Sequence, residues 1–226
     1  MTTKRVEPVT SSPPEYTGTV TNTPLLKRRP VVQPKVSRAE VNIELALLSK
    51  ESQRVYDQNF RYVARSFMNL SVRNREHPMF KSQKKQDLLD RILDYFRVDW
   101  LSLTREVGTA IQQMRILLDN EGIHQDEWVT YSTPLILRER LTTPDLKHHI
   151  RLLQQLDQLV IHIDSLWIHQ ILPERDARQK KKDYVNAAIK LGNRLSNFDS
   201  SLTKLVRDRN IVEIDIPAIE RILAGD

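Results

Sequence analysis

The sequence of 226 residues contains no cysteine, which excludes disulfide bonds, thiolate nucleophiles and cysteine-ligated zinc. Glycine is also rare. Because the five glycines stand far apart, neither a glycine-rich phosphate loop nor a dinucleotide fingerprint is possible. The most apolar run, residues 159–171, is interrupted by His162, Asp164 and His169 and is too polar to span a bilayer. The first residues form no apolar signal segment, so we expect a cytoplasmic protein without membrane partners.

Signatures of catalysis and metal binding are equally scarce. The sequence has no G-x-S-x-G elbow and no H-E-x-x-H helix. His162 and His169 with Asp164 suggest a metal site, but ligands seven positions apart on a helix are too distant for one ion. Acidic pairs such as Asp87 with Asp90 lie among lysines and arginines, as on solvated faces. The sequence therefore predicts no enzyme, no metal site and no cofactor, unless a constellation is assembled across helices.

The chain is basic, with a formal charge of +6 and a pI near 9.5, which fits nucleic acid or an acidic partner. Residues 1–36 hold six of the eleven prolines and no hydrophobic period, so they are predicted to be a disordered tail. Its second half is basic. This tail is either a solubilising leader or an arm that follows a phosphate backbone or an acidic surface. Residues 37–226 are predicted to form one mainly α-helical domain.

The remainder reads as long amphipathic helices. Ser37-Arg38-Ala39-Glu40 has the form of a capping box and predicts a helix to about Leu70, with a possible break at residues 50–53. Trp100 marks a possible join within the second helix and is expected to be a core anchor. The sequence shows no internal repeat. The predicted helices cover residues 37–70, 82–120, 143–172 and 174–209, and a short strand at 211–214 and a short helix at 217–223 follow.

Residues 133–141 are the best candidate for a β-strand. Leu135, Leu137 and Leu141 alternate with outward-facing residues, and a helix start follows at once. A lone strand cannot satisfy its own backbone groups, so we expect it to pair, with a second copy of the chain as a natural partner. The residues predicted to read DNA bases from the other face of this strand are Ile136, Arg138 and Arg140. Alternatively, the arginines guard an exposed edge against aggregation.

A basic run opens the last long helix, although the helix dipole disfavours cations at that end. One explanation is that this end faces DNA phosphates, which the free amides also attract. The alternative is a solubilising patch. The residues predicted to bind phosphate are Arg175, Arg178, Lys180, Lys181 and Lys182.

The order strand, helix, helix over residues 132–206 resembles the ribbon-helix-helix class of DNA-binding proteins, although the first helix is about twice the usual length. Residues 131–135, 166–168 and 186–189 make the whole chain similar to the AcaB-like transcriptional regulators of conjugative plasmids and integrative elements. That resemblance implies an activator of conjugation genes that binds double-stranded promoter DNA as a homodimer or higher homo-oligomer. The N-terminal helices would then set the oligomeric state or contact another regulator or RNA polymerase.

The sequence therefore favours a DNA-binding transcriptional regulator that reads the major groove with a two-stranded ribbon. The alternative is a helical protein–protein adaptor of a mobile element that does not bind DNA. In that case the strand would pair within the chain or with the edge of a partner.

Overall fold

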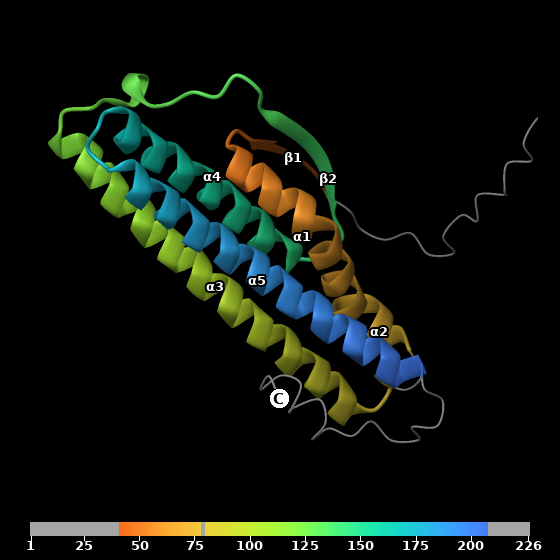
Figure 1. Ribbon diagram of the computed structural model, residues 1–226. Helices are drawn as coiled ribbons and strands as arrows, with labels where there is room; N and C mark the ends of the chain where they lie inside the picture. Colours follow the sequence, from red (N-terminus) through yellow and green to blue (C-terminus); the bar gives the residue numbers. More distant parts are fainter. Residues whose placement is uncertain (1–40, 78–79, 208–226) are drawn as a thin grey trace, which may run out of the picture. The chain divides into compact units, whose positions relative to one another are not determined.

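The computed structural model describes residues 41–77 and 80–207. The predicted tail, the capping box and the elements predicted at residues 211–214 and 217–223 lie outside these ranges. The described part is mainly α-helical, as predicted, with one small antiparallel sheet (Figure 1). The elements are β1 (Val41–Leu47), α1 (Lys50–Met68), the short α2 (Asn74–Glu76), α3 (Gln83–Asn120), β2 (Leu135–Leu141), α4 (Leu146–Ile168) and α5 (Glu174–Arg207).

The prediction of helix from residue 37 is wrong over Val41–Leu47, which is the strand β1. Its buried or half-buried residues, Ile43, Leu45 and Leu47, recur at period two, the period of a strand. The helix begins only at Lys50, where the side chain of Ser49 accepts a hydrogen bond from the amide of Ser52. The polar residues 50–53 are therefore the first turn of α1 and not a break within a helix.

The remaining helices were predicted closely. α3 is continuous, so the join expected near Trp100 does not exist; Trp100 itself is fully buried and packs on Phe67, as a core anchor should. Gly122 follows the end of α3 with a φ of 72°, a conformation that glycine adopts without strain. α4 begins at Leu146, three residues after the predicted cap at Thr143.

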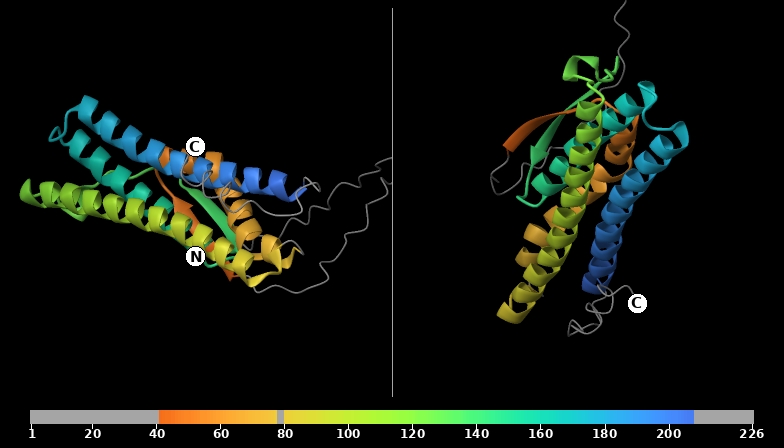
Figure 2. Two further views of the ribbon diagram at one scale, coloured as in Figure 1. Left: turned by 90° about the horizontal axis from the view of Figure 1, so that it is seen from below. Right: turned by 90° about the vertical axis from the view of Figure 1, so that its left-hand side faces the viewer.

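β1 and β2 pair antiparallel in full register. Val41 lies opposite Leu141 and Leu47 lies opposite Leu135, so Glu44 and Arg138 meet at the centre. The partner of β2 is thus a strand of the same chain. The backbone groups along this edge of β2 are hydrogen-bonded to β1, so they do not need the expected pairing with a second copy. The sheet packs on α4 and α1 at one side of the helices (Figure 2).

Each strand leads into a long helix, and each of these is followed by a second long helix. α1 and α5 run in one direction, and α3 and α4 run in the other (Figure 1). The described chain thus consists of two strand–helix–helix units, β1–α1–α3 and β2–α4–α5. The most extensive helix contacts join α3 to α4 and α1 to α5, so the second helix of each unit packs on the first helix of the other. Exchanging the unit β1–α1–α3 with the unit β2–α4–α5 preserves this arrangement, so the fold has an approximate twofold relation that the sequence does not reveal.

The helices enclose a core of leucine, isoleucine, valine and phenylalanine. α1 approaches α5 closely at Gly192, where a Cβ would lie 2.5 Å from the Nδ2 of Asn59. That side chain is buried and donates to the carbonyl of Ile189 at 3.0 Å, so the contact combines close packing with a hydrogen bond. None of the helices in the described ranges is long and apolar enough to cross a membrane.

Candidate nucleic-acid interface

The outer face of the sheet presents alternate residues of both strands to solvent. On β2, the side chain of Arg138 is 88% exposed, Ile136 is 61% exposed, and Arg140 is also exposed. The predicted sidedness of this strand is therefore confirmed. β1, a strand that was not predicted from the sequence, adds the exposed residues Asn42, Glu44 and Ala46. A two-stranded antiparallel ribbon of this kind has the dimensions that the DNA major groove admits.

The centre of this face carries opposite charges. Arg138 and Glu44 lie opposite each other in the register, and Nε of the arginine is 3.8 Å from a carboxylate oxygen of the glutamate. Both side chains are largely exposed, so this pair contributes little to stability. The guanidinium can exchange the carboxylate for another acceptor, such as the edge of a guanine.

The inner face holds the ribbon on the helices. Leu45 and Leu47 are fully buried, while Leu137 and Leu141 are half-buried against the core. Glu139 also points inward, where its carboxylate accepts a hydrogen bond from the hydroxyl of Tyr56 on α1.

A buried carboxylate fixes the turn that leaves β1. Asp157 of α4 accepts the backbone amides of Leu48 at 2.9 Å and Ser49 at 2.7 Å. It also accepts the hydroxyls of Ser49 at 2.7 Å and Ser52 at 2.5 Å. These donors lie just before α1 and in its first turn, where backbone amides lack helical partners and the dipole favours an anion. The end of the ribbon is thereby tied to a helix of the other unit.

The five basic residues at the start of α5 do not share one environment. Arg175, Arg178, Lys180 and Lys182 are exposed, and Arg178 pairs with Glu174 one turn earlier. Lys181 instead lies between Asp164 at 2.7 Å and Glu51 at 3.1 Å, with only 18% of its side chain exposed.

The surroundings of Lys181 keep it charged. Burial lowers the pKa of this ammonium, but its hydrogen bonds and charge interactions with Asp164 and Glu51 outweigh burial and raise the pKa above its ordinary value. Asp164 also accepts the hydroxyl of Tyr131 at 2.7 Å, and burial followed by this contact raises the pKa of the tyrosine. Lys181 thus joins α5 to α4 and α1, whereas its four neighbours face solvent.

Two of the histidines lie deep in the core. His149 is fully buried, accepts a hydrogen bond from the indole of Trp100 at 3.3 Å, and has a pKa lowered by burial to about 3. Burial also lowers the pKa of His162, whose ring packs against Trp128. His169 is exposed and contacts the carbonyl of Glu127. Within the described residues, no three His, Asp or Glu side chains are grouped as metal ligands.

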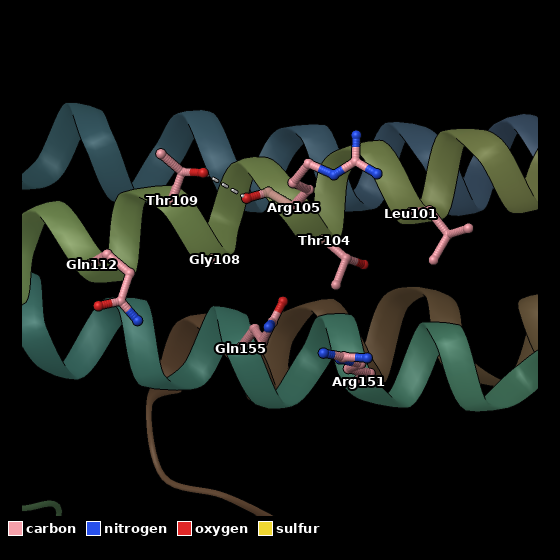
Figure 3. Close-up of a pocket in the computed structure, with 8 residues that line it drawn as sticks. All are labelled: Leu101, Thr104, Arg105, Gly108, Thr109, Gln112, Arg151 and Gln155. Atoms are coloured by element: carbon pink, nitrogen blue, oxygen red, sulfur yellow. Dashed lines mark hydrogen bonds between the residues drawn. The ribbon is translucent and has the colours of Figure 1, made fainter.

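A shallow cavity of about 420 Å³ lies between α3 and α4. Figure 3 shows Thr104 and Gln155 facing each other across it. The hydroxyl of Thr104 donates to the carbonyl of Trp100, and that of Thr109 donates to Arg105, so both are engaged within α3. The lining holds no histidine, carboxylate or activated nucleophile, so the cavity offers no acid–base or nucleophilic chemistry.

These features define a mainly helical protein whose exposed two-stranded ribbon is built within one chain. A solved structure shares this fold: AcaB from uropathogenic E. coli, in selenomethionine-containing form, superimposes with a TM-score of 0.66 at 19% sequence identity. The likeness covers 83% of this chain and 98% of that one, so the chain has an AcaB-like fold. No protein-family model matches the sequence, and a search of curated proteins found no match either.

Proposed function

We propose that this chain is a sequence-specific DNA-binding transcriptional regulator, an activator of conjugative transfer genes, that places the β1–β2 ribbon in the major groove of promoter DNA. The observation that carries the proposal is the outer face of the sheet. Its exposed side chains are held at fixed spacing by strands whose inner faces are anchored on helices. Ile136, Arg138 and Arg140 would contact base edges, and arginine matches the paired acceptors of guanine.

The exposed cations at the start of α5 would contact the phosphate backbone. Lys181 pairs with Glu51, in the first turn of α1, which places the start of α5 close to one end of the ribbon. Arg175, Arg178, Lys180 and Lys182 extend from there into solvent. Such cations add affinity that depends on salt but not on sequence.

The transcriptional role, and control of conjugation in particular, come from the resemblance to AcaB-like regulators. In this proposal, association of copies into homo-oligomers and contacts with another regulator or RNA polymerase use helix surfaces, and each chain brings its own ribbon to its own DNA site, because both strands of the ribbon come from one chain.

A second candidate function is a helical adaptor that binds protein and not DNA. The observation in its favour is the exposure of large apolar side chains outside the sheet, including Ile116 at 55% and Ile168 at 58%. Where such side chains lie next to one another, they mark surfaces that bind other proteins.

A gel-shift titration at physiological salt separates the two functions, using duplexes from upstream regions of neighbouring genes. The parent chain should select one region over random duplex of equal length. Replacing both Arg138 and Arg140 by alanine should abolish this preference, since each good bidentate contact discriminates by about 1–3 kcal/mol. Lys182→Ala should weaken binding to every duplex alike and lower the salt dependence.

Arg61→Ala is the matched control, because this arginine is exposed on α1 and lies outside the ribbon and the start of α5. It should bind like the parent. Unchanged selectivity in the double arginine variant would overturn the assignment of the ribbon, and absence of any duplex binding by the parent would favour the adaptor.

A further inference from the structure

The two strand–helix units are joined by equivalent ion pairs. Lys181 of α5 pairs with Glu51 in the first turn of α1. Arg97 of α3 pairs, at 2.5 Å, with Asp145, the cap of α4. Each pair ties the second helix of one unit to the start of the first helix of the other. The approximate twofold relation therefore extends from the backbone to specific contacts at both ends of the ribbon.

Under this relation, the outward residues of the two strands correspond but are chemically different. Asn42 corresponds to Ile136, Glu44 to Arg138, and Ala46 to Arg140. In a ribbon made of two identical strands, these positions would be the same and both ends of the ribbon would present one surface.

The two ends of the ribbon consequently offer different chemistry. At one end the register sets Asn42 beside Arg140, and at the other it sets Ala46 beside Ile136. Asparagine suits the N6 and N7 groups of adenine, and arginine suits guanine. Alanine and isoleucine offer only apolar contact, which suits the methyl group of thymine.

The charged residues beside the two ion pairs also differ between the two units. Near Lys181, α5 carries exposed Arg178 and Lys182. At the equivalent place on α3, Arg97 also pairs with Asp94 at 2.7 Å, and that carboxylate is 65% exposed. Arg178 is paired with Glu174 and Asp94 with Arg97, so this difference in charge rests mainly on the exposed Lys182 of α5.

We infer that a single chain supplies the complete ribbon and recognises an asymmetric duplex site. One half of this site is read at purines by Asn42 and Arg140, and the other is contacted at thymine methyl groups by Ala46 and Ile136. This inference rests on the proposed function, because it assumes that the ribbon enters the groove. It departs from the symmetric site that two identical strands would select.

Selection of binding duplexes from a random pool by the full chain tests the inference, with the number of chains per duplex measured by native mass spectrometry. The expected result is one motif without inverted symmetry, bound by one chain. Arg140→Gln should reduce the preference for guanine by about five- to a hundredfold in one half of the motif and leave the other half unchanged.

A symmetrising variant gives the sharpest comparison. Ala46→Arg with Ile136→Asn makes the two ends of the ribbon alike, and both positions are exposed, so the fold should tolerate the changes. The motif selected by this variant should have matching outer positions in its two halves. An inverted repeat bound by two parent chains would overturn the inference while supporting DNA binding. A pool without any enrichment would overturn the proposed function and the inference with it.

Discussion

The two faces of the sheet are built from the same two strands but have opposite environments. Inward, Leu45 and Leu47 have no exposed surface, and Glu139 is held by Tyr56. Outward, Ile136 is 61% exposed, and the side chain of Arg138 is 88% exposed. The comparison shows that the inner residues hold the ribbon in place, while the outer residues contribute little packing and are available to a partner.

The largest expected difference between the faces is in packing. Leu45→Ala removes a fully buried side chain and should lower the free energy of unfolding by about 2–5 kcal/mol. Ile136→Ala, the matched change on the outer face, should cost less than about 0.5 kcal/mol. Urea denaturation followed by circular dichroism measures both values. Equal losses in the two variants would show that the outer face is also packed.

A smaller loss is expected at the turn that leaves the ribbon. Asp157→Asn removes a negatively charged acceptor of hydrogen bonds from two backbone amides and two hydroxyls. The NH2 group of the new asparagine is itself a donor and would face these donors. We expect a cost of about 1–3 kcal/mol in the same denaturation experiment. The control is Asp119→Asn, because the side chain of Asp119 is 60% exposed and its ion pair with Arg115 is long, at 3.8 Å. A stability of Asp157→Asn equal to that of the control would contradict the role given to this carboxylate.

The smallest effect on stability is expected at the centre of the outer face. Glu44→Gln breaks only an exposed ion pair and should change the free energy of unfolding by less than about 0.5 kcal/mol. Because it removes a negative charge from the proposed interface, it should also tighten binding to random duplex DNA. Fluorescence anisotropy across a salt series measures this gain, which should fade as the salt rises. Weaker binding by this variant would count against contact between this face and DNA.

Much of the helical fold could be predicted from the sequence because long amphipathic helices are specified locally. The helical spacing of apolar residues predicted the positions of α3, α4 and α5. Gly122 marked the end of α3, and Pro173 marked the boundary between α4 and α5. The two sides of β2 were also predicted, since alternation over 133–141 depends only on neighbouring residues.

β1 was missed although its signal was present. Val41, Ile43, Leu45 and Leu47 alternate, but the pattern spans only seven residues, and the apparent cap at Ser37 favoured a helix. Correct placement of β1 would have shown that Glu44 lies on the outer face of the sheet. The role of Lys181 could not be found in this way, since its carboxylate partners lie on α1 and α4 and are brought together only by the tertiary fold.

The pairing of β1 with β2 also has a consequence for how the chain is made. All of α1 and α3 lies between the two strands, so β1 leaves the ribosome long before its partner is synthesised. Contacts between such distant segments carry a high loop-closure cost and form slowly unless intervening helices first bring the strands together. Until then, the apolar side of β1 and both of its edges are open to other chains, and crowded nascent copies are exposed to mispairing at this stage. The strand that completes the ribbon therefore depends for its pairing on residues that are synthesised long after it.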